Sequence, residues 1–556
     1  MPKIPLVTPP ASHEEDMIEH EENLHPSQRA QSQLMTVAQA SVWATRRTGR
    51  EVTPSNISYL IKYGRIPGIE KNGTLLVSVG DLEQYYQSRA GHTEDFYKRR
   101  LGKNLNWHLS FEQFKESETT KHVHRLHPYK GKFIPQLVEY FLDSHTDEFK
   151  DEACFQPGDL VLDPFCGSGT TMVQASELGM HAVGIDVSLF NSMISNLKLS
   201  KVEQRDLVTA TMIVGNCVAS NIDGKDARAF EEELLAELKT FNGQFFPAPQ
   251  FRRLVRSGEI DEDRYGSEKA AEFLPKFNAL LEKHNVCNDI EPTPDDFLNT
   301  WFLPPVRSEI ESARSYIDGY TDLLLRDVLR LILSRTARSS RATTHSDLAT
   351  LLRPVTETYY CSKHSKICKP LFSMLGWWRR YADDTVKRMG QFQKLRTNTM
   401  QVCLTGDSRT IDILATLEES DSEIAALVRK NKIRGIFSSP PYVGLIDYHE
   451  QHAYAYELFD LPRNDGAEIG PLSAGRGRQA REAYVEGIAS VLVNCQQYMA
   501  EDCNVFLVAN DKFGLYPRIA ALSGMTIAKE YKRPVLNRSE GDKGAYAESI
   551  FHMRKV

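Results

Sequence analysis

A glycine-rich turn that follows an apolar run constrains the fold of this chain more than any other feature. Residues 160–162 are Leu-Val-Leu, and residues 163–171 are Asp-Pro-Phe-Cys-Gly-Ser-Gly-Thr-Thr. This pattern predicts a buried parallel strand, a tight turn and a helix that continues to residue 178. Gly167 and Gly169 let a ligand approach the backbone closely, and the helix start presents unpaired N–H groups to an anion. The stretch predicts a nucleotide-like ligand, although structural turns also use glycine.

A second apolar stretch ends in an acid. Residues 181–186, His-Ala-Val-Gly-Ile-Asp, are predicted to form the next strand, which places Asp186 where it can accept hydrogen bonds from ribose hydroxyls. The order strand, glycine turn, helix, strand and acid is that of a nucleotide-binding βαβ unit. The alternation of strands and helices resumes at residues 401–408, where a strand ends in Gly406-Asp407.

A further apolar strand runs into two consecutive prolines. Residues 435–438, Gly-Ile-Phe-Ser, precede the corner Ser439-Pro440-Pro441-Tyr442. The prolines force an extended backbone and remove two N–H donors, so that carbonyl groups remain free to accept hydrogen bonds beside an aromatic ring. Such a corner suits a planar amine.

Together, the turn at residues 163–171 and the corner at residues 439–442 resemble the hallmark pair of the S-adenosylmethionine-dependent DNA amino-methyltransferases, which methylate exocyclic nitrogens. The resemblance implies an α/β fold with a doubly wound, mostly parallel sheet, S-adenosyl-L-methionine as cofactor and double-stranded DNA as partner, with the target base flipped into the site. Many members with this form of the turn place it after the corner, whereas here it comes first. The location of the target-recognition region therefore stays open.

The resemblance also implies roles for individual residues. At the corner, Ser439 and the Pro440 carbonyl would accept hydrogen bonds from the amine beside Pro441, and Tyr442 would stack on the base. Asp407 would accept from the adenine amine of the cofactor. The segment before the turn would pack over the methionine end of the cofactor, and a basic loop that faces DNA is an alternative for its lysines. The implied cofactor-binding residues are Asp163, Phe165, Gly167, Gly169, Thr170, Asp186, Asp407, Lys130 and Phe133, with Tyr129 and Gly131 as further neighbours.

The first residue of the corner bears on the product. Family members with Asp there mostly methylate the adenine N6 amine, and those with Ser mostly methylate the cytosine N4 amine, so Ser439 implies N4-methylcytosine. A protein of this kind belongs to a restriction-modification or related defence system, in which a cognate restriction endonuclease is a further partner. The alternatives are an N6-adenine enzyme, an RNA amino-methyltransferase and a DNA-binding regulator without catalysis. Cytosine carbon-5 enzymes are disfavoured because the chain lacks their Pro-Cys dipeptide.

The N-terminal region precedes these motifs. Residues 1–33 are rich in proline and acids and are predicted to be a disordered tail. Residues 34–90 combine helix-turn-helix spacing with a hairpin and a helix, which resembles a small winged helix; a docking module without DNA contact is the alternative. In the winged-helix interpretation, the residues that face DNA are Ser55, Asn56, Ser58, Lys62 and Arg65, with Lys71 on the wing.

The rest of the chain divides into a linker or surface helices at residues 91–120, a first catalytic part at 121–204, a mainly helical insertion at 205–395 and a second catalytic part at 396–556. In the insertion, Arg252 and Arg253 are predicted to contact nucleic acid, because arginine-rich helices bind phosphates and base edges. A helical cap that shapes the cofactor pocket is the alternative. Residues 533–553 are expected to form a closing hairpin.

Three residues in the insertion invite a zinc proposal, namely Cys361, His364 and Cys368. A closed structural site needs four ligands, and a fourth Cys or His is missing at a usual spacing. The spacing of these residues therefore predicts no metal ion.

Composition sets outer bounds on the function. The 556 residues are 41% hydrophobic and 25% charged, which predicts several folded domains. A net charge of -7 excludes a uniformly basic coat, so that DNA would be bound by local patches. Nine cysteines at irregular spacing are typical of reduced thiols, and neither a signal peptide nor a membrane-length apolar run is visible. We expect a cytoplasmic protein without a membrane partner; the oligomeric state is not predicted.

Overall fold

The computed structural model describes residues 34–48, 52–62, 66–71, 74–87, 92–147, 149–293, 296–345, 351–536 and 544–556. The chain divides into two compact units: Met1–Arg99 with Phe241–Tyr265, and Arg100–Thr240 with Gly266–Val556. Residues 1–33, the predicted tail, lie outside the described residues.

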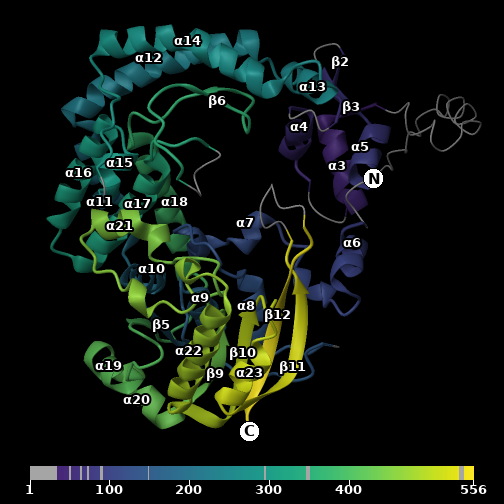
Figure 1. Ribbon diagram of the computed structural model, residues 1–556, viewed down its shortest axis with the longest axis vertical. Helices are drawn as coiled ribbons and strands as arrows, with labels where there is room; N and C mark the ends of the chain where they lie inside the picture. The colour runs from purple at the N-terminus through teal and green to yellow at the C-terminus, as the bar shows by residue number, and fades with distance from the viewer. Residues whose placement is uncertain are drawn as a thin grey trace, which may run out of the picture. The chain divides into compact units, whose positions relative to one another are not determined.

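The larger unit is built on a seven-stranded sheet of order β11-β12-β10-β9-β4-β5-β8. Strands β4, β5, β8, β9 and β10 run parallel, whereas β12 is antiparallel to both of its neighbours. Figure 1 shows β10, β12 and β11 side by side toward the C-terminus. The mostly parallel α/β sheet predicted from the sequence is confirmed. The strands are β4 (Leu160–Asp163), β5 (His181–Asp186), β8 (Gln401–Thr405), β9 (Ile433–Ser438), β10 (Met499–Ala509), β11 (Met525–Pro534) and β12 (Ala547–Lys555).

The central strands are apolar because helices cover both faces of the sheet. Leu162, Val183, Ile436 and Val505, from four neighbouring strands, are fully buried in one core. The strand order reverses at β4, which lies between β5 and β9, and ligands bind at such a switch point beyond the carboxyl ends of the strands. The covering helices are α8 (Pro135–Leu142), α9 (Thr170–Glu177), α10 (Leu189–Leu199), α19 (Ile413–Ser420), α20 (Ser422–Asn431), α22 (Arg478–Gln496) and α23 (Tyr516–Leu522). A further helix, α21 (Ala453–Leu458), packs against helices from between β5 and β8.

Between β5 and β8 the chain leaves the sheet and forms a series of helices and one short hairpin. Fully buried Glu309 connects three of these helices: it pairs with Arg228, and it accepts hydrogen bonds from Ser373 Oγ at 2.9 Å and from Met374 N at 2.7 Å. That this region is an insertion for target recognition stays a prediction. Its elements are α11 (Gln204–Ala219), α12 (Ile222–Phe245), α13 (Gln250–Ser257), α14 (Glu262–His284), α15 (Phe297–Trp301), α16 (Pro304–Asp318), α17 (Leu323–Ser340), β6 (Tyr359–Cys361), β7 (Lys366–Cys368) and α18 (Leu375–Gln393).

The smaller unit contains a three-stranded sheet of order β1-β3-β2 with helices around a small apolar core. Two helices, a strand pair and a third helix follow one another as the sequence predicts, but the identification as a winged helix stays a prediction. Residues 241–265, which include α13, cluster with this unit. The elements are β1 (Leu34–Thr36), α3 (Val37–Thr48), α4 (Pro54–Lys62), β2 (Ile69–Lys71), β3 (Thr74–Ser78) and α5 (Val79–Gln87).

The stretch expected to be a linker or surface helices contains α6 (His92–Leu101), a 3-10 turn at Trp107–Ser110 and α7 (Glu116–Thr119). Part of it binds the edge strand β11: Asn106 N donates to the Lys532 carbonyl at 2.8 Å, and Arg533 Nε donates to the Leu109 carbonyl at 3.0 Å. Residues 101–109 are thus part of the catalytic unit. In the described part of the chain, no helix is long and apolar enough to cross a membrane.

Candidate active site

An open pocket lies at the carboxyl ends of β4, β5, β8 and β9. Its empty volume is about 800 Å³, the solvent-filled space at its mouth included. The pocket is lined by residues 129, 131–133, 164–168, 170, 186, 187, 191, 407, 408, 439, 441, 448 and 467–469. The structure thereby brings together the glycine turn, both strand-end acids and the proline corner, which are far apart in sequence.

The glycine turn has a conformation that favours glycine. Gly167 and Gly169 have φ angles of 52° and 75°, which L side chains rarely adopt. A Cβ atom on Gly167 would lie 2.9 Å from the Tyr129 hydroxyl, and one on Gly169 would lie 2.9 Å from Ser195 Oγ. Gly169 caps α9 and is not among the lining residues, whereas Phe165, Gly167 and Thr170 line the pocket.

Asp186 has a structural role in addition to the predicted one. Its Oδ2 accepts a hydrogen bond from Gly167 N at 2.7 Å, and its Oδ1 accepts from Ser188 N at 2.9 Å and from Asn191 Nδ2 at 3.1 Å. A carboxylate offers about four acceptor positions, so that one position remains on Oδ2, at the wall of the pocket. Burial raises the pKa of Asp186 to about 6 despite these hydrogen bonds.

Asp407 also lines the pocket, but it is paired with a neighbouring cation. Arg409 Nε lies 2.9 Å from Oδ1, and Arg409 Nη2 lies 2.6 Å from Oδ2. Partial burial alone would raise the pKa of Asp407, but the hydrogen bonds and the charge of Arg409 outweigh burial and lower this pKa. Both carboxylate oxygens therefore already accept from protein, and the predicted contact with an adenine amine would have to share them.

Asp163 connects the two motifs and is not among the lining residues. Its buried Oδ1 accepts a hydrogen bond from Ser438 Oγ at 2.5 Å, directly before the corner, and another from Phe165 N at 3.2 Å. Thr171 Oγ1, in the first turn of α9, donates to the Phe437 carbonyl at 3.1 Å, which joins the helix that follows the glycine turn to β9. Burial raises the pKa of Asp163 to about 6.

Hydrogen bonds to β10 and β12 hold the proline corner in place. Ser439 Oγ donates a hydrogen bond to the Val508 carbonyl at 3.1 Å, and Ser439 and Pro441 line the pocket. Pro440 is buried. Tyr442, which was predicted to stack on a base, is not a lining residue. Its hydroxyl donates to Glu548 Oε1 at 2.8 Å, which anchors the ring to β12.

The segment before the glycine turn forms another wall. Gly131, Lys132 and Phe133 line the pocket with Tyr129, while Lys130 is exposed and lies outside the lining. The ring of Tyr129 stacks on Tyr448, with 6.1 Å between the centroids. Burial, together with neighbouring arginines, lowers the pKa of Lys132 to about 8.

Several lining residues were missed by the sequence analysis, among them Asn191, Ser408, Tyr448, Glu468 and Ile469. Glu468 accepts hydrogen bonds from Tyr448 N at 3.1 Å and from His449 N at 2.8 Å. The segments after β9 have no regular periodicity, so the sequence offered no local pattern for Tyr448, Glu468 and Ile469. Asn191 could have been found, because it lies one turn into the helix that follows Asp186.

The predicted DNA-binding residues that can be placed lie in the smaller unit. Ser55, Ser58, Lys71 and Arg253 are exposed, and Arg252 is partly exposed beside Arg253 on α13. Asn56 is exposed as well, but its Oδ1 accepts from Thr53 N at 2.9 Å and from Thr53 Oγ1 at 2.8 Å, which caps α4. Lys62 ends α4, and Arg65 lies outside the described residues.

Comparisons with known proteins identify relatives of this chain. Residues 52–194 match a family model described as DNA methylase. Type II methyltransferase M.MjaII of Methanocaldococcus jannaschii is 41% identical over 526 residues, which cover 94% of this chain and 97% of that protein. Type II methyltransferase M.MvaI of Kocuria varians is 29% identical over 127 residues, 23% of this chain and 26% of that protein. M.EcaI of Enterobacter cloacae is 40% identical over 62 residues, 11% of this chain and 14% of that protein.

The seven-stranded, mostly parallel sheet fits a methyltransferase fold. Similarity over nearly the whole length then gives the family: the chain belongs to the type II DNA methyltransferases of the N6/N4 type, and it is an enzyme of restriction-modification systems.

The anchor of Tyr442 generates a first prediction. Glu548 Oε2 also accepts from Arg533 Nη1 at 2.9 Å, and Arg533 is only 4% exposed. Glu548→Ala would leave this cation buried without its carboxylate, so we expect the free energy of unfolding to fall by about 3 kcal/mol. Tyr442→Phe removes one hydrogen bond and should cost about 1 kcal/mol. Denaturation in urea measures both.

The matched control is Glu501→Ala, because Glu501 pairs with Lys555 in the same sheet but its side chain is 96% exposed. We expect a change within about 0.5 kcal/mol for this variant. Equal stabilities of Glu548→Ala and Glu501→Ala would show that the buried pair does not hold the corner.

Proposed function

We propose that this enzyme transfers a methyl group from S-adenosyl-L-methionine to the exocyclic N4 amine of a cytosine that is flipped out of duplex DNA at a specific site. The observation that carries the proposal is that the Gly167 turn and the Ser439 corner line one pocket, in a chain of the N6/N4 type. In a restriction-modification system, a cognate endonuclease would cut the same unmethylated site. Methylation of the adenine N6 amine is the second candidate, because both bases present an amine beside a ring nitrogen.

The residues of the pocket fit the cofactor. Asp186 retains one acceptor position for a ribose hydroxyl, and the side chain of Phe165 supplies an apolar surface beside it. Because Gly167 has no side chain, a ligand could approach the backbone of the turn closely there. When bound, S-adenosyl-L-methionine supplies an activated methyl group, so that the protein needs to position the amine rather than to activate a separate reagent.

The hydrogen bond of Ser439 decides what the corner offers to an amine. A serine hydroxyl has one donor and two acceptor positions, and the Ser439 donor is directed at the Val508 carbonyl. The lone pairs of Oγ are therefore left to accept an N–H of the amine. Pro440 and Pro441 add no N–H group that would compete, and the Pro440 carbonyl is a second acceptor. Two acceptors would orient the amine and increase the electron density on its nitrogen as this nitrogen attacks the methyl group.

We propose that the smaller unit supplies phosphate contacts. It combines exposed Lys71 on β2 with the exposed arginine Arg253 on α13, and α4 presents the hydroxyls of Ser55 and Ser58. The net charge of -7 means that DNA must be bound through such local groups.

The product tests the main proposal. We expect N4-methylcytosine in duplex DNA after incubation with the labelled cofactor, as shown by nucleoside analysis. N6-methyladenine as the sole product would overturn the base assignment and leave the fold and the corner unchanged, whereas label in RNA but not in DNA would overturn the substrate class. Ser439→Ala, which removes one acceptor of the amine, should lower the rate of methyl transfer by roughly 10²-fold.

The pKa of Asp186 gives a pH dependence for cofactor binding. Ribose hydroxyls donate to the ionised carboxylate and favour that form, so binding should weaken as the pH falls through about 6 and Asp186 takes up a proton. Between pH 7 and pH 5 we expect the dissociation constant to rise up to about tenfold, since the carboxyl and amino groups of the cofactor titrate outside this window. Calorimetric titration measures the constant, and thermal unfolding at each pH shows that the protein is folded.

Asp186→Asn is the control for this titration. It cannot ionise, so its affinity should be weaker at pH 7 and nearly flat toward pH 5. If the affinity of Asp186→Asn for the cofactor depended on pH as in the wild type, another group would take up the proton. Asp163 has the most similar pKa, about 6.

The salt dependence of DNA binding tests the smaller unit. Each phosphate contact contributes about 0.9 to the slope of log K against log salt, so Lys71→Ala/Arg253→Ala should lower the slope by about 2. The control Lys394→Ala/Lys430→Ala removes two exposed lysines that precede the amino ends of β8 and β9, at the edge of the sheet opposite the corner. Equal slopes for both double variants would favour a docking module.

A further inference from the structure

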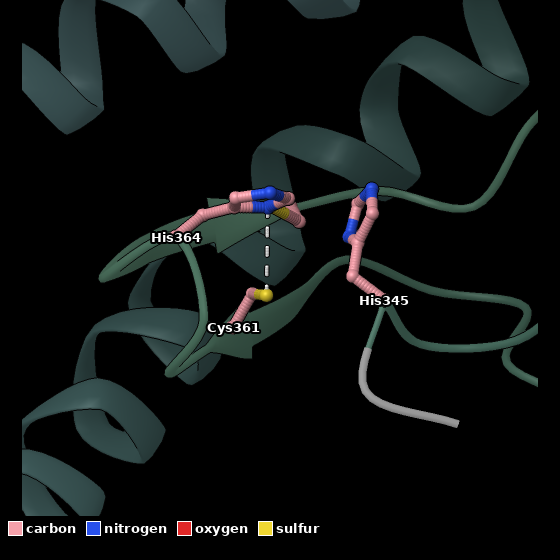
Figure 2. A group of neighbouring side chains, drawn as sticks. His345, Cys361 and His364 are labelled. Carbon is pink, nitrogen blue, oxygen red and sulfur yellow. Dashed lines mark hydrogen bonds between the residues drawn. The ribbon is translucent and has the colours of Figure 1, made fainter. Parts of the chain in front are cut away.

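The hairpin of β6 and β7 brings together four residues of the types that bind transition metals. Cys361 and Cys368 lie on the two strands, and His364 lies in the turn between them. His345, which follows α17, completes the group: one ligand atom from each of the four residues lies within 4.8 Å of the others. Figure 2 shows the His345 ring beside Cys361 and His364.

We propose that these four residues bind one zinc ion in a closed structural site. The local sequence predicts no metal because a fourth Cys or His is missing at a usual spacing, but the fold adds a fourth candidate from outside that spacing. His345 comes from a segment outside the hairpin, and the tertiary fold rather than the local sequence brings it to the other three.

The distances fit a tetrahedral ion. Zinc bonds of about 2.3 Å to sulfur and about 2.0 Å to nitrogen, at tetrahedral angles, separate a sulfur ligand from a nitrogen ligand by roughly 3.5 Å. His364 Nδ1 lies 3.6 Å from Cys361 Sγ and 3.5 Å from Cys368 Sγ. The rings of His345 and His364 have centroids 4.4 Å apart and meet edge to face at 73°, so that they do not stack on each other.

The surroundings of the ligands also suit zinc. The two cysteines are 2% and 7% exposed, and both are free thiols. The Tyr359 hydroxyl lies 2.8 Å from His345 Nδ1 and accepts from His345 N at 3.1 Å, which fixes the segment of the fourth ligand to the first strand of the hairpin. Two sulfur and two nitrogen ligands form a common set for structural zinc, and none of the four lines the active-site pocket.

The fold has a use for such a cross-link. Each strand of the hairpin has only three residues, and an isolated two-stranded hairpin is at best marginally stable. The hairpin packs on α14, because a Cβ atom on Gly266 would lie 2.4 Å from the Tyr360 ring. An ion held by His345 and the hairpin would join the end of α17 to the start of α18 across the intervening residues.

The full-length chain, without a tag and purified without chelators, tests the proposal. Elemental analysis by mass spectrometry should find about one zinc per chain, and replacement by Co²⁺ should give the visible bands of a tetrahedral site together with thiolate-to-cobalt charge transfer. His345→Ala should weaken zinc binding by more than about tenfold, because this variant removes a ligand without truncating the hairpin. Cys361→Ser should remove the charge-transfer intensity of one thiolate.

The controls are Cys287→Ser and His145→Ala, which remove an exposed thiol and an exposed imidazole outside the cluster. Both should keep the full zinc content. The proposal is overturned if the wild-type chain holds no zinc before or after addition of Zn²⁺ and shows no Co²⁺ spectrum. It is also overturned if His345→Ala binds zinc as tightly as the wild type, or if the unreduced protein contains a Cys361–Cys368 disulfide.

Discussion

The hydrogen bond from Ser438 to Asp163 joins two motifs that lie 275 residues apart in sequence. It exists because β4 and β9 are neighbours in the sheet, where Val161 pairs with Gly435 and Leu162 with Ile436. The carboxylate is buried, and its Oδ1 accepts from Ser438 Oγ and from the first N–H of the turn. The turn that would hold the cofactor and the corner that would hold the amine are thus parts of one rigid layer. Methyl transfer depends on such rigidity, because a site must hold its reacting groups to within about 0.5 Å.

The part of the fold that positions this layer could be predicted because its chemistry is local. Strands buried on both faces must be apolar throughout, so 160–162, 181–186 and 435–438 are recognisable as short runs. Residues that follow parallel strands meet at one edge, which places Asp186 and Ser439 together without knowledge of side-chain positions. The contacts that could not be predicted depend on side-chain conformations. Arg409 donates hydrogen bonds to the Asp407 carboxylate, and Glu468 lines the pocket from an irregular segment. His345 could not be predicted as a fourth metal ligand either, because a spacing rule detects only ligands that one local motif supplies.

The long segment between β5 and β8 lowers the stability of the sheet only a little. The entropy of closing a loop rises only with the logarithm of its length, and the region has its own anchors. Glu309 is one of them: burial raises its pKa, and it is satisfied by Arg228, Ser373 and the Met374 amide, so that the acid is retained only because every partner is present. A zinc ion at the hairpin would likewise join the end of α17 to the segment that leads into α18, where each strand of the hairpin has only three residues.

The neighbour of Ser439 explains why a hydroxyl suits this corner. The Val508 carbonyl on β10 is an acceptor that needs a donor, and Ser439 supplies one at 3.1 Å. A carboxylate held in the same rotamer would face that carbonyl with no proton between two acceptors, and the repulsion would turn it away. Ser439 therefore donates to the Val508 carbonyl of β10 and still presents the lone pairs of its Oγ to the pocket. On the proposed assignment the amine must then supply the donor, which both cytosine and adenine can do. On this proposal the corner would recognise an exocyclic amine as such, and the groups that face the ring would determine the choice of base.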